Sequence, residues 1–161
     1  MQREGWPEPG SLVVCTVTDV VDFGAFVSLD EYYGKQGLIH ISEVASGWIK
    51  YIRDHVREGQ KIVCKVLNVD TSRHHIDLSL KDVNEHQRRE KIQEWKADQK
   101  AWKWLEMAYK ERPADAKRVA DALVEAYDSL YLAMEEAAVS GAAALADVRL
   151  PEEDVRILES I

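Results

Sequence analysis

Cysteine is scarce in this sequence, and the two that occur, Cys15 and Cys64, both lie in segments that alternate like β-strands. Small secreted domains usually carry more cysteines in a disulfide framework, so a reducing, cytoplasmic location is expected. Both residues fit the role of small apolar side chains in a core. Because the sequence has no CxxC pair and no His/Cys cluster, we expect no metal site.

Long hydrophobic runs are also missing. No segment approaches the roughly 20 apolar residues that a membrane-spanning helix needs, so no membrane association is expected. The first ten residues, MQREGWPEPG, are charged and contain two prolines, unlike a signal peptide. Glycine-rich phosphate loops and the patterns GxSxG, HExxH and GxxxxGKS/T do not occur, so we expect neither catalysis nor a bound cofactor.

An excess of basic charge is missing as well, since the net charge is -8. Such a balance argues against attraction of the whole molecule to nucleic acid. The acid is concentrated at the C-terminal end, where residues 115–161 hold four Lys or Arg against eleven Asp or Glu. The preceding residues are close to neutral, and residues 86–103 carry six basic residues against three acids. This distribution leaves room for a neutral or basic RNA-binding face outside the C-terminal end.

The first half of the chain has the period of two residues that is typical of β-strands. Five segments alternate in this way: 11–21, 24–30, 37–42, 61–70 and 75–81. In the last of them the alternation places Ser79 on the outer face. A longer segment, 43–59, separates the third strand from the fourth. Five short strands with one long insertion predict a closed barrel of the OB type, because so small a sheet left open would expose unpaired edges.

After Lys81 the period changes to about 3.6 residues, which indicates helices. Asn84 and Gln87 have the spacing of a capping box, so a helix is expected to begin there. Trp95 and Trp102 recur on one face of this helix and are expected to be largely buried. Pro113 is expected to end it.

The remaining residues are expected to complete a compact helical bundle. Asp115 is a candidate cap for a second helix. That helix either continues unbroken to Val139, or Asp128 caps a separate helix within this stretch. Gly141 is expected to interrupt the helical pattern, and Pro151 to open a last short helix.

Four blocks in the first half resemble the S1 RNA-binding domain in order, spacing and identity: VTDVVDFGAFVSL, GLIHIS, VLNVD and IDLSLK. The resemblance implies a multi-domain β + α protein, with a five-stranded OB-fold (S1-type) barrel at residues 1–82 and a compact all-α helical domain at 83–161. It also implies an RNA face built from Phe23 and Phe26, with His40 nearby. Chemistry supports this assignment, since stacking on an exposed aromatic ring contributes roughly 1–3 kcal/mol per unpaired base.

Further basic residues in loops and turns are candidates for contacts to RNA phosphates: Lys50, Arg53, Arg73 and His75. Every candidate also has a plainer interpretation. The aromatic rings, Phe26 above all, are also suited to a core, and His40 is suited to satisfying a local backbone group. The basic side chains also fit an ordinary solvated surface.

A narrower resemblance covers the whole chain. The run HISEVASGWIKYIRDHVREGQKIVCKV, followed by HIDLSLK, is similar to the alpha subunits of archaeal translation initiation factor 2. This resemblance implies a non-catalytic, cytoplasmic subunit of a heterotrimer that delivers initiator Met-tRNA to the small ribosomal subunit, with GTP on the gamma subunit. Initiator tRNA, mRNA and the small ribosomal subunit are the implied RNA partners.

The same resemblance implies two differences from relatives. The family's C-terminal domain, which anchors the gamma subunit, has no counterpart before Ile161, so we expect a fragment of the first two domains. Eukaryotic relatives are phosphorylated on a serine after strand three; that position is Ala45 here, with Ser46 next to it. Two other functions remain open: an S1 accessory domain of an RNA-processing or exosome-type nuclease complex, and a structural spacer.

Overall fold

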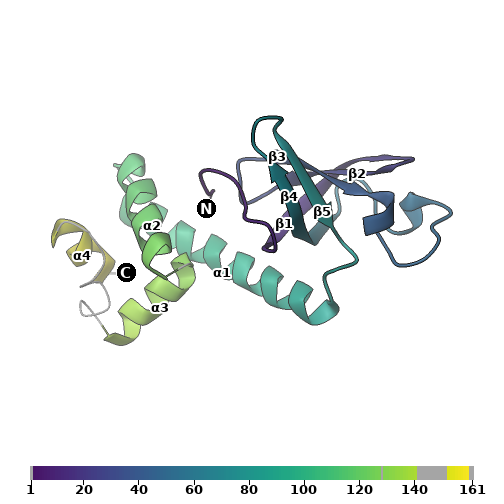
Figure 1. Cartoon of the computed structure of the whole chain (residues 1–161). Helices are drawn as coiled ribbons and strands as arrows, with labels where there is room; N and C mark the ends of the chain where they lie inside the picture. Colours follow the sequence, from purple (N-terminus) through teal and green to yellow (C-terminus); the bar gives the residue numbers. More distant parts are fainter. Residues whose placement is uncertain (1, 128, 141–151, 160–161) are drawn as a thin grey trace. The chain divides into compact units, whose positions relative to one another are not determined.

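The computed structural model describes residues 2–127, 129–140 and 152–159, which include a β-barrel and four helices (Figure 1). They form two compact units, which divide inside the first helix. One unit is Gln2–Gln93 and the other begins at Glu94. The predicted fold class, a five-stranded barrel followed by helices, is confirmed.

The barrel has five strands: β1 (Leu12–Val21), β2 (Gly24–Leu29), β3 (Lys35–His40), β4 (Lys61–Asp70) and β5 (His75–Ser79). Antiparallel pairs join β1 to β2, β2 to β3, β1 to β4 and β4 to β5, and a short parallel pairing of β3 with β5 closes the ring. Closure leaves no unpaired sheet edge, which is the physical reason for predicting a barrel from so few strands.

The core of the barrel consists of the apolar side chains that the strand period points inward. Cys15 on β1 and Cys64 on β4 are both fully buried and unbridged. A hydrogen bond with Cys64 and burial raise the pKa of the Cys15 thiol well above its usual range, so the thiol stays protonated. The interpretation of both residues as small core side chains is confirmed.

Ser79 corrects the expected alternation of the last strand. It was predicted to face outward, but its side chain is fully buried. The Ser79 hydroxyl accepts a hydrogen bond from the backbone N–H of Asp82 at 3.2 Å. Burial is therefore tolerated because the hydroxyl has a partner, in the turn that leads the chain out of the barrel.

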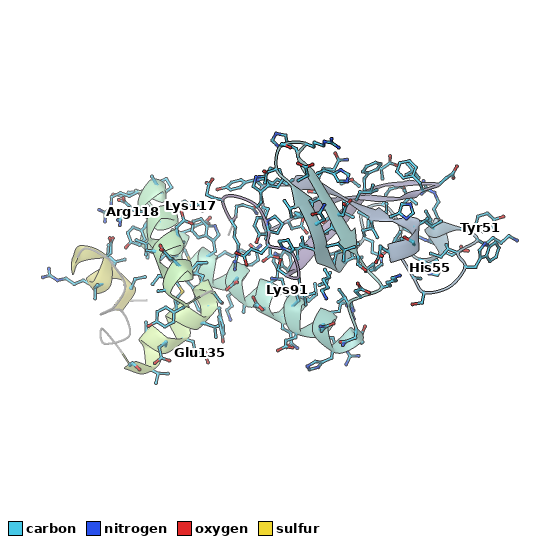
Figure 2. The ribbon with its side chains drawn as sticks, viewed as in Figure 1. Tyr51, His55, Lys91, Lys117, Arg118 and Glu135 are labelled. Carbon is cyan, nitrogen blue, oxygen red and sulfur yellow. The ribbon has the colours of Figure 1, made fainter. Side chains whose placement is uncertain are left out.

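Helix α1 (Glu85–Ala108) begins at the predicted capping box. The Gln87 N–H donates to Asn84 Oδ1 at 2.8 Å, and the Asn84 N–H donates to Gln87 Oε1 at 3.0 Å. The first turns of the helix also reach the barrel core, since Lys91 Nζ lies 3.2 Å from the carboxylate of buried Glu31 (Figure 2). The first unit thus extends into α1. Within this unit, the ion pair joins the start of α1 to the barrel.

The second unit packs the rest of α1 with α2 (Pro113–Tyr127), α3 (Leu130–Ser140) and α4 (Glu152–Glu159). The fully buried side chains of α1 lie in its C-terminal part, at Ala101 and Leu105, followed by Tyr109 just beyond the helix. Trp95 and Trp102 keep only a minor part of their surface exposed, in line with the prediction that both are largely buried, and Trp102 packs against this core.

The predicted helix ends need two corrections. Helix α1 ends at Ala108, before a turn, and Pro113 opens α2 instead of closing α1. A proline suits the first helical position because its missing N–H has no partner to lose there. Asp115 therefore lies inside the first turn of α2 and is not its cap. Its carboxylate lies 3.6 Å from the guanidinium groups of both Arg112 and Arg118.

Two separate helices, α2 and α3, occupy the stretch that the sequence left undecided. Ser129 precedes α3 and caps it, since its hydroxyl accepts the Leu132 N–H at 3.3 Å. Asp128, Gly141 and Pro151 lie outside the described residues. The last helix predicted after Pro151 is present as α4. Among the described helices, none is both long and apolar enough to span a membrane.

Candidate nucleic-acid interface

Two aromatic rings stand on the outside of the barrel. Phe23 lies in the β1–β2 turn with 51% of its surface exposed, and Phe26 follows on β2, half-buried. Their rings meet edge to face, with centroids 6.0 Å apart. Neither ring belongs to the barrel core. Phe23 therefore presents about half of its surface to solvent, with the Phe26 ring packed against it at a right angle.

The backbone around Phe23 is held firmly. Its carbonyl accepts the Ile41 N–H at 2.8 Å, which continues the ladder between β2 and β3. Gly24 is required next to it, because a Cβ at this position would lie 2.3 Å from the carbonyl oxygen of Ile39. The close approach of the two strands thus fixes the direction in which the Phe23 ring leaves the barrel.

Strand pairing brings other residues beside the aromatic pair. Phe26 is opposite Leu38 on β3, and Leu38 is opposite Asp77 on β5. His40 is opposite Gly24, at the Phe23 end of the same pair of strands. On the other side, Phe26 is opposite Asp19 of β1. The outer face around the rings therefore carries carboxylates as well as apolar groups, which weakens its attraction for phosphate.

His40 has a structural task in addition to its exposed position. Its Nδ1 accepts the Ser42 N–H at 3.2 Å and lies 2.8 Å from the Ser42 hydroxyl. These contacts cap the short helix η1 (Ile41–Glu43). Nδ1 is therefore occupied by local contacts, as the plainer interpretation of His40 proposed.

Two candidate basic residues, Arg73 in the β4–β5 turn and His75 at the start of β5, are each close to an acid. His75 Nε2 lies 2.8 Å from Asp77 Oδ1 on the same strand. Arg73 Nε lies 3.7 Å from Asp70, whose pKa is lowered by the Ser72 hydroxyl and by backbone N–H groups of the turn. Arg73 thus contacts its own turn, whereas His75 lies on β5, and β3 separates that strand from the strand of Phe26.

Lys50 and Arg53 lie in the long segment between β3 and β4. Lys50 Nζ is 5.5 Å from the centre of the Tyr51 ring. Arg53 pairs with Glu58 at 2.8 Å, an exposed hydrogen-bonded contact that raises the pKa of the guanidinium and lowers that of the carboxyl. Arg53 Nη2 also reaches the Val20 carbonyl at 3.4 Å. Because Val20 is close to the β1–β2 turn, the structure brings Arg53, but not Arg73, to the end of the barrel that carries Phe23.

Two exposed aromatic residues in the same segment were not among the predicted site residues. Trp48 has 84% of its surface exposed and Tyr51 has 61%. A usable signal was present in the sequence, since the run Trp48, Lys50, Tyr51, Arg53 alternates aromatic and basic side chains. Such a mixture is typical of single-stranded nucleic-acid sites.

The basic surplus of residues 86–103 divides between paired and unpaired groups. Arg88 and Arg89 both pair with Glu85, which lowers the pKa of that carboxyl to about 2. On the second unit, the exposed lysines Lys96 and Lys100 are not within ion-pair distance of a carboxylate among the described residues. In the same described part of the chain, no three His, Cys, Asp or Glu side chains are placed to hold a metal ion.

Comparison with known proteins places these features in a family. Residues 7–81 match the S1 RNA binding domain family. Translation initiation factor 2 subunit alpha of Haloarcula marismortui is 57% identical over 157 residues, covering 96% of this chain and 59% of that protein. The Archaeoglobus fulgidus subunit is 56% identical over 151 residues, covering 92% of this chain and 57% of that protein. The chain therefore spans about three fifths of the length of these relatives.

Solved structures agree over both units. The intact alpha subunit of aIF2 from Pyrococcus abyssi has a TM-score of 0.85 and 43% identity, covering 96% of this chain and 60% of that one. A structure described as an a/eIF2alpha–aDim2p–rRNA complex from Pyrococcus horikoshii has a TM-score of 0.91 and 43% identity, covering 97% of this chain and 95% of that one. The chain belongs to the family of the alpha subunit of archaeal translation initiation factor 2.

Proposed function

We propose that this chain is the RNA-binding part of an initiation factor 2 alpha subunit, which supports delivery of initiator Met-tRNA to the small ribosomal subunit. The exposed Phe23 ring, on a barrel that matches the S1 RNA binding domain family, is the observation that carries this proposal. The Pyrococcus horikoshii relative, described in a complex with rRNA, supports contact with RNA.

In this proposal the barrel, residues 1–82, supplies the RNA contacts and residues 83–161 form the helical middle domain. An unpaired base stacks on Phe23, with Phe26 as the support of that ring and His40 at its edge. The basic side chains outside the aromatic pair contact phosphates: Lys50, Arg53, Arg73 and His75. Because most of them already have carboxylate neighbours, binding by this chain alone is expected to be micromolar or weaker.

The chain acts without catalysis, in the cytoplasm, as part of a GTP-dependent heterotrimer. The gamma subunit binds GTP and is held by the C-terminal domain of the family, as the resemblance implies. Initiator tRNA, mRNA and the small ribosomal subunit are the proposed RNA partners. The relatives that match almost the whole chain are named as subunits of an initiation factor. Their names favour this function over a nuclease accessory domain.

Replacement of Phe23 by alanine tests the proposal. Loss of one stacked base is worth about 1–3 kcal/mol, so the Kd for a single-stranded oligouridine should rise roughly 5- to 150-fold. The melting temperature should hardly change, because the ring is half exposed and lies outside the core. Tyr33→Ala is the matched control: Tyr33 is 54% exposed but follows the opposite end of β2.

Two results would count against this assignment. If Phe23→Ala and Tyr33→Ala bind oligouridine equally well, the aromatic pair is not an RNA site. If Phe23→Ala instead lowers the melting temperature strongly, the ring is part of the fold. Capture of a GTP-binding subunit and initiator tRNA from an extract separates the proposed role from the nuclease alternative, which predicts capture of nuclease subunits.

A further inference from the structure

The segment between β3 and β4 is anchored to the barrel at several points. It contains η1 and the short helix η2 (Ile52–Asp54), and it sends Val44, Ile52 and Val56 into the barrel core. Ile49 is partly buried against the same core. A loop held by so many apolar contacts has a defined conformation, so the side chains that it points outward are presented in fixed positions.

Those outward side chains include two large aromatic rings. Gly47 adopts a φ of +84°, a conformation that favours glycine, immediately before Trp48. Trp48 is 84% exposed and Tyr51 is 61% exposed, on either side of the anchoring Ile49. Figure 2 shows Tyr51 at the outer edge of this loop, directed away from the barrel. Large aromatic side chains that a rigid loop leaves in water indicate a binding surface, because their burial is so favourable.

Charged groups of both signs follow the rings along the chain. Lys50 lies between them in sequence and sits over the Tyr51 ring. Next along the chain, Arg53, His55 and Arg57 line a shallow hollow of about 440 Å³, together with Asp54, Glu58 and Gln60. Arg53 is paired with Glu58, whereas the side chains of His55 and Arg57 form no ion pair within the described part of the chain.

We infer that this loop is a second binding site for unpaired RNA, with stacking rings of its own, beside the end of the barrel that carries Phe23. One or two bases stack on Trp48 and Tyr51, and the adjoining phosphate lies in the hollow against His55 and Arg57. Unpaired bases suit the site better than a duplex, because bases in a duplex are stacked on each other and have no free face for an indole. Among the described residues, Lys50, Arg57 and Asp54 of this loop form no ion pair, and this excess of one positive charge favours a polyanion over an apolar protein surface.

This inference rests on the proposed RNA-binding function and adds a site to it. The test uses the whole 161-residue chain with fluorescein-labelled oligouridine, measured by anisotropy at two or more salt concentrations. Trp48→Ala should raise the Kd roughly 5- to 150-fold, whereas Trp48→Phe, which keeps a ring, should restore most of the affinity. Arg57→Gln should reduce the salt slope by about 0.7, the amount expected for one lost phosphate contact. Tyr33→Ala is again the exposed aromatic control.

The outcomes are distinguishable. If Trp48→Ala binds like the unmodified chain while Phe23→Ala binds weakly, the second site is wrong and the proposed function stands. If neither variant changes binding, both fail. A base-paired RNA stem that binds as tightly as oligouridine would overturn the assignment to unpaired bases. A Trp48→Ala chain with normal RNA affinity that no longer binds a purified protein partner would identify a protein surface and overturn the inference. Equal circular dichroism spectra establish that the variants are folded.

Discussion

Replacing Lys91 by methionine should strongly destabilise the barrel. The Lys91 ammonium lies 3.2 Å from Glu31 Oε2, and the two side chains are only 12% and 7% exposed. The other oxygen of Glu31 accepts the Val14 N–H at 3.1 Å. Methionine keeps most of the lysine's length and removes only its charge. The variant therefore leaves a buried carboxylate with a single backbone donor.

The size of the effect follows from the cost of an unpaired buried charge. Breaking a buried ion pair on one side costs about 3–5 kcal/mol. We therefore expect a loss of roughly 3–5 kcal/mol at pH 7.

Urea unfolding followed by circular dichroism at pH 7 measures this loss of stability. The double variant Glu31→Gln with Lys91→Met is the control, since the glutamine amide oxygen still accepts the Val14 N–H but carries no charge. It should recover most of the lost stability at pH 7. A Lys91→Met variant within 0.5 kcal/mol of the unmodified chain would refute the reasoning.

Two further substitutions test other parts of the fold. Gly24→Ala should destabilise the barrel by about 1–3 kcal/mol or more in urea unfolding, because the new methyl group meets a backbone carbonyl of β3 at 2.3 Å. Unchanged stability would show that the strands can separate there. Asp154→Ala should lower the stability of the helical unit by about 1–3 kcal/mol in thermal unfolding. The Asp154 carboxylate accepts hydrogen bonds from the buried Tyr109 hydroxyl at 2.7 Å and from the Arg118 guanidinium at 2.9 Å. An unaltered melting curve would contradict this role.

Much of the candidate site was predictable from the sequence because its residues are set by local patterns. Phe23 and Phe26 flank Gly24 at the start of a predicted strand, and the strand is where the pattern placed it. The contacts of the polar candidate residues depended instead on how the loops and turns that carry them fold. Arg53 finds Glu58 and the Val20 carbonyl, and His40 finds Ser42. Which of several possible partners a charged side chain meets is decided by packing and not by spacing along the chain.

The errors have the same origin. Ser79 follows the alternation of its strand, yet it is buried because the following turn folds over it and supplies a donor. Pro113 was expected to end a helix, yet it opens α2, because a turn already separates the two helices. From sequence alone, a tryptophan in a loop fits either an anchor in the core or an exposed ring, and this applies to Trp48. Its surface exposure separates the two interpretations.

The sequence by itself determined the strands, the change to helices after Lys81 and the capping box at Asn84, because period and capping are properties of neighbours along the chain. Only the tertiary structure decided that Glu31 pairs with Lys91, 60 residues away, and which aromatic rings face water. Those outcomes depend on barrel closure, which brings distant segments together and assigns each side chain either to the core or to solvent.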